Sequence, residues 1–267
     1  MSRIKIRKYR ISLPSKTERP SSPIRIVMIG DMHNRMFGEG NQDLVDKIVG
    51  LYPDLVGSGG DLSVVKPGLD VKPEPGIALL KRLSCECPVY CILGNHAHRT
   101  KEDREAYPGV YERLKKALHA PNITLLENER TETEVKGSRL FIYGYELPLK
   151  YYKKRSKENV SRDEIREAIG EPAEGAYNIL LAHNPVHFES YAQWGADLTM
   201  SGHLHGGTVR IPFAGGVVSP QLKLFPKYDC GLFMKYGRKM VVTAGLGTHS
   251  MVMRINNPAE ISLIELY

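Results

Sequence analysis

The chain has 267 residues, of which 42% are hydrophobic and 25% charged, and 37 Lys and Arg against 30 Asp and Glu give a net charge of +7. This composition is ordinary for a soluble globular protein, and the length suits one large domain or two small ones. No apolar run approaches the ~18 residues that a membrane-spanning helix needs, so the sequence excludes such a helix.

Residues 1–23 predict an N-terminal strand and a proline-rich lead-in to a single domain over residues 1–267. Residues 3–12 alternate Ile and Tyr with basic residues, as in a solvent-facing strand at a sheet edge. Prolines at positions 14, 20 and 23 then interrupt the chain. The basic N-terminus has neither an apolar stretch nor a cleavage site, so we expect no secretory signal.

The next segment predicts a β-α-β-α-β alternation. Apolar runs at residues 24–29, 53–56 and 88–93 favour strands, and residues 44–49 and 78–83 have helical spacing. Such an alternation is typical of a largely parallel, buried sheet. Each predicted strand is followed by polar residues: Asp31-Met32-His33, Gly60-Asp61 and Gly94-Asn95-His96. Sites in α/β sheets form at these carboxyl ends.

Three of the four cysteines lie in one short segment that leads into the predicted strand at 88–93: Cys85, Cys87 and Cys91. Cys230 lies far away in the sequence. Their C-x-C-x3-C spacing is not a zinc-finger or zinc-ribbon pattern. Ordinary reduced thiols are therefore favoured over a metal site. Reduced thiols and the lack of a signal predict a cytoplasmic protein.

The second half of the chain repeats the pattern of strands that end in polar motifs. Strands are predicted at 140–143, 178–182 and 197–201, and the last two precede Ala182-His183-Asn184 and Gly202-His203-Leu204-His205. Ser161 and Glu164 form a capping-box pattern that opens a helix. Short β-like runs follow at 208–211, 232–236, 240–244 and 260–266. We expect an α/β fold, a four-layer α-β-β-α sandwich of two mixed sheets with helices outside.

The five motifs together predict a metal centre. A single His is better explained by an ordinary hydrogen bond, but a whole set at strand ends is not. The set offers carboxylate, amide and imidazole ligands from Asp31, His33, Asp61, Asn95, His183, His203 and His205. Mixed ligation of this kind suits Mn, Fe, Zn or Co better than Ca or Mg, and there are enough donors for two divalent ions.

Two metal ions roughly 3.5–4 Å apart make a phosphoryl-transfer site, because they generate a hydroxide near neutral pH and neutralise phosphate oxygens. In this reaction a metal-bridging hydroxide attacks phosphorus, and the departing oxygen needs a proton. His96 adjoins Asn95 and is not needed as a ligand, so it is the predicted general acid.

The ordered motifs resemble those of the calcineurin-like metallophosphoesterase superfamily, whose pattern is D-x-H, G-D, G-N-H-[DE], H and G-H-x-H. Flanking residues 182–185, 206–213 and 245–248 are similar to a branch of small bacterial phosphoesterases that includes envelope-associated proteins and UDP-diacylglucosamine hydrolases. The resemblance implies that one metal takes Asp31, His33, Asp61 and His205. It also implies that the other takes Asp61, Asn95, His183 and His203, with Asp61 bridging.

Two positions depart from the family pattern. Ala97 stands where the family has an acidic residue that normally orients the catalytic His. Gly57-Ser58-Gly59 replaces bulkier apolar residues in the strand before Asp61, and interior glycines weaken a strand. Neither departure removes a predicted metal ligand.

Substrate-binding residues are harder to assign. Arg35, which follows His33 closely, is a candidate phosphate contact, although a surface arginine fits equally well. His249 and Arg254 follow a glycine turn that could lie near the metals. The basic-aromatic stretch at 150–157 could overhang the site and contact an anionic group, and the alternative is a solvated loop.

The sequence is compatible with three interpretations of the protein's function. The first is a dinuclear hydrolase of phosphoesters or pyrophosphates that acts on a phosphate-containing small molecule or a lipid headgroup. The second is a phosphate-binding scaffold of the same fold. The third is a nucleic-acid phosphodiesterase, which the positive charge suggests but no nucleic-acid-binding motif supports. The charge also fits peripheral contact with an anionic membrane, and the oligomeric state is not predicted.

Overall fold

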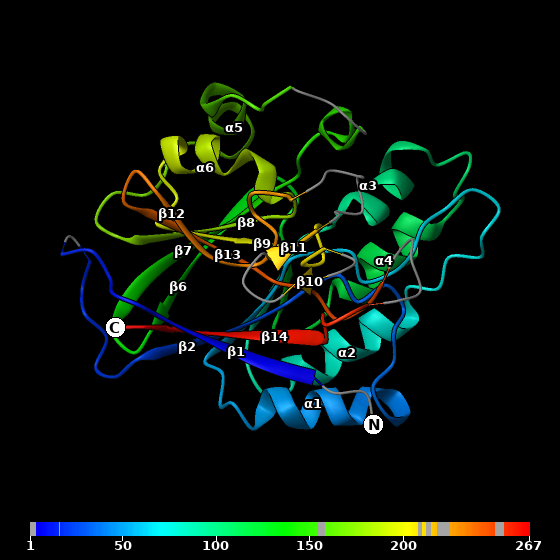
Figure 1. Ribbon diagram of the computed structural model, residues 1–267, viewed down its shortest axis with the longest axis horizontal. Coiled ribbons are helices and arrows are strands. Elements are labelled where there is room, and N and C mark those ends of the chain that lie inside the picture. The colour runs from blue at the N-terminus through cyan, green and yellow to red at the C-terminus, as the bar shows by residue number, and fades with distance from the viewer. Residues whose placement is uncertain are drawn as a thin grey trace.

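Two six-stranded sheets pack face to face between outer helices in the computed structural model (Figure 1). The structure describes residues 4–15, 17–153, 158–207, 210–211, 215–217, 225–248 and 254–267. Both sheets are mixed, which confirms the predicted four-layer α/β sandwich. Among the described residues, no helix has the length and apolar character needed to cross a bilayer.

The first sheet carries the N-terminal half of the chain. Its strands, in spatial order, are β1 (Ile4–Ile11), β14 (Ala259–Leu266), β2 (Ile24–Ile29), β3 (Leu55–Ser58), β4 (Val89–Cys91) and β5 (Ile123–Leu125). Strands β2 to β5 are parallel to one another, whereas β14 runs antiparallel to β2. The predicted edge strand is β1, and it pairs with the C-terminal strand.

The second sheet is built from the C-terminal half. Its order is β12 (Gly231–Lys235), β13 (Arg238–Val242), β9 (Leu198–Ser201), β8 (Tyr177–Ala182), β7 (Ser138–Tyr145) and β6 (Glu129–Val135). The four inner strands are parallel and the two outer strands are antiparallel to their neighbours. A small ribbon of β10 (Arg210–Ile211) and β11 (Gly215–Gly216) is separate.

Helices cover the outer face of each sheet (Figure 1). The first sheet packs against α1 (Gln42–Val49), α2 (Glu74–Ser84) and α4 (Val110–Leu118), and the second against α5 (Arg162–Ile169) and α6 (Phe188–Trp194). The predicted capping box opens α5, since the Ser161 side chain accepts from the Glu164 N–H and the Glu164 carboxylate accepts from the Ser161 N–H. Helix α3 (Asn95–Glu102) begins at a predicted site residue. Short 3-10 turns are Glu39–Asn41, Leu149–Tyr152 and Pro185–His187.

The core between the sheets explains the glycine-rich strand β3. Ile26 and Met28 of the first sheet face Leu181 and Met200 of the second in one buried cluster. A Cβ at Gly57 would lie 2.5 Å from the Met200 Cε, so the glycine provides the space that this side chain fills. The strand therefore keeps its apolar packing, with the bulk supplied by the opposite sheet.

Candidate metal centre

The predicted site residues come together where strands of both sheets end. The loops after β2, β3 and β4 come from the first sheet, and those after β8 and β9 come from the second. The eight residues are at most 9% exposed: Asp31, His33, Asp61, Asn95, His96, His183, His203 and His205. Parallel strands place their carboxyl ends at one edge of a sheet, which is why motifs far apart in sequence meet here.

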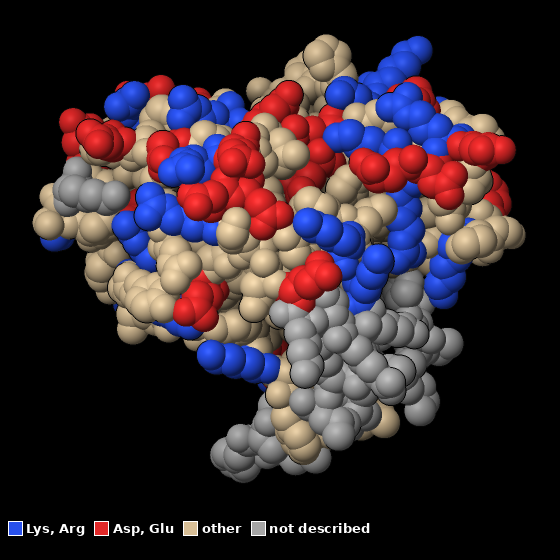
Figure 2. All heavy atoms as spheres, turned by 90° about the horizontal axis from the view of Figure 1, so that it is seen from above, with Lys and Arg blue, Asp and Glu red and all other residues tan. Residues whose placement is uncertain are grey.

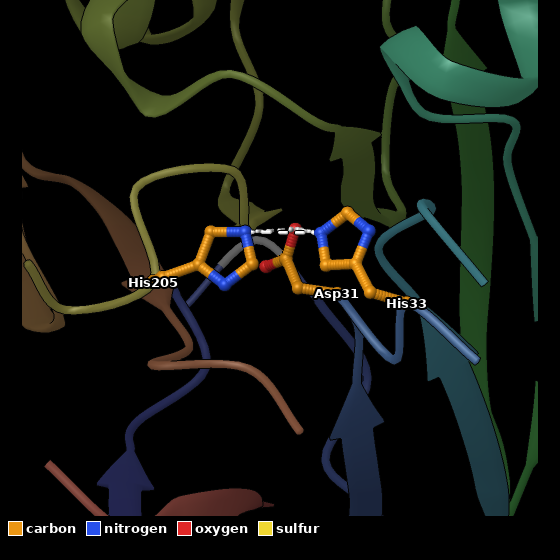
Figure 3. Close-up of side chains that lie close together, drawn as sticks. All are labelled: Asp31, His33 and His205. Atoms are coloured by element: carbon orange, nitrogen blue, oxygen red, sulfur yellow. Dashed lines mark hydrogen bonds and ion pairs between the residues drawn. The ribbon is translucent and has the colours of Figure 1, made fainter. Parts of the chain in front are cut away.

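Asp31, His33 and His205 form one compact group (Figure 3). The Nε2 atoms of His33 and His205 are 3.1 Å apart, and the rings stack with centroids 4.8 Å apart. Asp31 lies between the two imidazoles, its Oδ1 3.9 Å from His33 Nε2 and 3.6 Å from His205 Nε2. One carboxylate oxygen and two imidazole nitrogens of this group thus lie within 4.8 Å of one another.

Asp61, His183 and His203 form a second group. The Asp61 Oδ2 lies 3.1 Å from His183 Nε2, and the rings of His183 and His203 are 5.0 Å apart. Asp61 also belongs to a third group with His33 and His96. Its carboxylate is therefore within reach of residues from both predicted metal sets.

Backbone carbonyls orient two of the imidazoles. His183 Nδ1 lies 2.6 Å from the Gly59 carbonyl oxygen, and His205 Nδ1 lies 3.2 Å from that of Gly247. A carbonyl oxygen only accepts hydrogen bonds, so each Nδ1 carries the proton and donates. The Nε2 atom then faces the carboxylates, the arrangement typical of histidines that bind metals.

Each carboxylate is fixed by an N–H group from another motif. The His203 N–H donates to both oxygens of Asp31, at 3.1 and 2.9 Å. The His96 N–H donates to Asp61 Oδ1 at 2.9 Å. A Cβ at Gly202 would collide with Asp31 Oδ2, and one at Gly94 would come within 2.5 Å of the Asp61 nitrogen. The motif glycines therefore make room for the carboxylates.

The donor set fits divalent cations. The Asn95 Oδ1 is buried and accepts no hydrogen bond from any of the described residues. An unpaired buried oxygen is costly, and a cation would satisfy it. Carboxylate, amide and imidazole donors in one buried place suit Mn, Fe, Zn or Co.

The backbone at the site is strained. Five of the predicted ligands have positive φ values: Asp31 at 50°, His33 at 49°, Asp61 at 53°, His203 at 69° and His205 at 52°. This left-handed region is unfavourable for residues with a Cβ. Strain of this kind persists at functional sites, where surrounding contacts impose it.

Charges inside the cluster are strongly coupled. Burial opposes a charge on His183, but Asp61 and Asp31 outweigh it and raise its pKa to about 9. Burial also opposes the charge on Asp61, yet His183 and His96 hold the pKa of that carboxyl well below its usual range. Burial, helped by His183, lowers the pKa of His203 far below that of a free imidazole. The Asp61 carboxyl is therefore anionic and available as a ligand.

His96 is held by a backbone group in place of a carboxylate. Its Nδ1 lies 2.8 Å from the Val65 N and 3.0 Å from the Val65 O. Ala97, where the family has an acidic residue, packs into the apolar core of the first sheet. Burial lowers the pKa of His96 although Asp61 opposes this. The contact to Val65 had no local signal in the sequence.

Of the predicted substrate-binding residues, Arg35 and Arg254 line one cavity together with His33 and Thr248. Burial lowers the pKa of Arg254 to about 10 although Asp31 opposes this, so the guanidinium stays charged at neutral pH. His249 lies outside the described residues.

Sequence reasoning singled out no individual aromatic residue at the site, and the structure supplies Tyr152. Its ring lies 5.1 Å from that of His203 and 6.1 Å from that of His183. Tyr152 belongs to the basic-aromatic stretch predicted to overhang the site, and this part of the stretch does lie against it. Residues 154–157 of the stretch lie outside the described residues.

Comparison with known proteins gives a consistent family match. The family model for the calcineurin-like phosphoesterase domain matches residues 24–207. The chain is 25% identical to the uncharacterized protein YpbG of Bacillus subtilis, over 96% of this chain and 85% of that protein. It is 26% identical to the phosphodiesterase YaeI of Escherichia coli, over 92% of this chain and 83% of that protein.

A solved structure supports the fold alone. The sulfate thiohydrolase SoxB of Thermus thermophilus superposes with a TM-score of 0.50 at 14% identity, over 85% of this chain and 53% of that chain.

Proposed function

The chain belongs to the calcineurin-like phosphoesterase family and is a metallophosphoesterase, and from this premise we propose that it is a dinuclear hydrolase of phosphoesters or pyrophosphates. The observation that carries the proposal is the pair of buried groups, Asp31-His33-His205 and Asp61-His183-His203. We assign the first group with Asp61 to one ion, and the second with Asn95 to the other. Asp61 would contribute to both ions, and Mn, Fe, Zn or Co are the expected metals.

When bound, two such ions generate a hydroxide near neutral pH and neutralise phosphate oxygens. The protein's own residues hold the site in shape. Asp31 and Asp61 keep their orientation through the N–H groups of His203 and His96. His183 keeps its Nε2 atom directed inward through its bond to Gly59.

We assign His96 as the general acid that protonates the departing oxygen. Val65 contacts its Nδ1 and leaves Nε2 as the ring nitrogen for proton transfer. In the charged ring Nδ1 donates to the Val65 carbonyl and Nε2 carries the proton that a leaving oxygen takes, which returns the ring to its neutral form. General acid catalysis of this kind typically contributes ~10²–10⁴ in rate.

The experiment compares metal-loaded wild-type protein with Asp61→Asn on bis(p-nitrophenyl) phosphate and Mn²⁺, with metal content measured in parallel. We expect two ions per chain and turnover in the wild type, and loss of both in the variant. Exposed Asp163 provides the matched control, and Asp163→Asn should behave as the wild type. A wild-type protein that binds metal but hydrolyses nothing would favour the scaffold alternative.

We propose a small phosphate-containing molecule or lipid headgroup as the substrate. On the face seen in Figure 2, basic and acidic side chains are interspersed. A nucleic-acid phosphodiesterase is expected to gather its Lys and Arg into a basic patch. The described residues on this face therefore give no support to a nucleic-acid interface here.

A further inference from the structure

A cavity of about 330 Å³ lies beside the proposed metal centre. The described residues that line it are His33, Arg35, Thr248 and Arg254. His33 is one of the proposed ligands, so the cavity adjoins the place where a scissile phosphate would bind. Its volume is at the lower end of the range for small-molecule pockets.

One turn of the chain anchors both arginines of this cavity. Arg35 Nη1 donates to the Leu246 carbonyl at 3.1 Å. Arg254 Nη1 donates to the Gly245 carbonyl at 2.9 Å, and its Nη2 donates to the Ala244 carbonyl. Three consecutive carbonyls thus hold two guanidinium groups side by side.

The same turn is joined to the metal centre. The Gly247 N–H donates to the Asp31 carbonyl at 2.6 Å, and the Gly247 carbonyl is the partner of His205 Nδ1. The arginines are therefore fixed relative to two proposed metal ligands. A rigid link of this kind places a second binding group at a set position from the first.

Neutral groups anchor the two arginines, although the nearby Asp31 charge opposes the lowering of the Arg254 pKa. Within the described residues, neither Arg35 nor Arg254 forms an ion pair with a carboxylate, and their anchors are neutral carbonyls. A guanidinium has five N–H donors, and the anchoring bonds use only a few of them. Planar forks of this type bind oxyanions bidentately.

We propose that this cavity binds a second phosphate of the substrate, next to the phosphate at the metal centre. The preferred substrates would then contain two neighbouring anionic phosphates, as diphosphate diesters do, and not an isolated phosphodiester. This inference rests on the proposed function for its catalytic consequence, but the anion site itself can be tested without metal.

The binding test uses metal-free wild-type protein in chelator, titrated calorimetrically with inorganic pyrophosphate. We expect binding that weakens at least about tenfold in Arg35→Gln/Arg254→Gln. The control Arg10→Gln/Arg139→Gln removes two exposed arginines and the same net charge, and it should bind as the wild type. Equal pyrophosphate affinity in the wild type and the cavity variant, with matching thermal stability, would overturn the site.

The activity test compares two substrates with the same nucleosides. Diadenosine diphosphate has two adjacent anionic phosphates, whereas adenylyl-(3′→5′)-adenosine has one. We expect wild-type kcat/KM to favour the diphosphate, and the ratio of the two values to fall at least about tenfold in the cavity variant. An unchanged ratio would contradict the substrate class. If the wild type hydrolyses neither substrate but still binds pyrophosphate, the proposed function is refuted and the proposed anion site is retained.

Discussion

Backbone strain at the metal ligands predicts an unusual stability effect. His205 has a φ of 52°, where a Cβ costs about 1–2 kcal/mol. His205→Gly and His205→Ala both remove the imidazole, so their difference isolates the backbone. Glycine loses about 0.4–1 kcal/mol through its freedom in the unfolded chain. The net expectation is that His205→Gly is more stable than His205→Ala by about 1 kcal/mol.

A matched position should show the opposite sign. His183 is a proposed ligand in the same cluster, but its backbone is not left-handed. The backbone at His183 therefore has no such strain. The free energy of unfolding of His183→Ala should be higher than that of His183→Gly by about 0.4–1 kcal/mol. His33, with a φ of 49°, should follow His205. The comparison therefore contains its own control for cavity formation and lost hydrogen bonds.

The assay is urea unfolding of the metal-free variants in chelator. The only tryptophan, Trp194, is buried beside α5 and gives a fluorescence signal for loss of the core. Free energies come from linear extrapolation with a shared slope. If His205→Ala is at least as stable as His205→Gly, or if His183 shows the same sign as His205, the ligand backbone does not store strain.

Three further predictions concern the acid, a motif glycine and the thiols. His96→Gln should lower kcat on a poor leaving group by ~10²–10⁴ and less on p-nitrophenyl esters, with metal content intact; loss of metal would make His96 a ligand. Gly202→Ala should displace the Asp31 carboxylate and reduce bound metal, so full occupancy by elemental analysis would contradict the contact. At pH 8, native protein should show one reactive thiol, Cys85, which is exposed. Burial raises the pKa of Cys91 to about 12, so almost no Cys91 thiolate forms at pH 8 or 9. Reaction of a second thiol by pH 9 would contradict this prediction.

Local pattern was sufficient to predict the strands that carry the site. Strands β2, β3, β8 and β9 each contain a short apolar segment and end close to a glycine or a turn residue, and both signals are readable within a few residues. The capping box of α5 is equally local. The sequence could therefore place the proposed ligands near strand ends, because each lies within four residues of the end of its strand.

Contacts between distant segments had no such signal. The pairing of β1 with β14 joins the two ends of the described chain. Met200 fills the space above Gly57 across the sheet interface, and the sequence predicted only that this glycine weakens the strand. Tyr152 likewise reaches His203 from the 3-10 turn Leu149–Tyr152. Each depends on how the layers stack, and periodicity does not encode stacking.

His96 shows how such a contact changes a functional expectation. The missing acidic side chain at Ala97 left the sequence with no partner for the imidazole. In the structure Val65 provides a backbone partner from a different loop. Any residue type can supply a backbone N–H or carbonyl. The amino-acid sequence alone therefore does not identify Val65 as the partner of His96, whereas the folded structure does.

The motif glycines do more than permit turns, because they also leave space for the carboxylates of other motifs. Gly94 leaves room for Asp61, and Gly202 leaves room for Asp31. In both cases the glycine of one motif packs against the carboxylate of another, and an N–H one or two residues later in the chain donates to that same carboxylate. Gly202 and Asp31 come from opposite sheets. Glycine packing and sheet packing therefore constrain the carboxylates that we propose as metal ligands, which explains how this edge can hold five proposed ligands in the left-handed region.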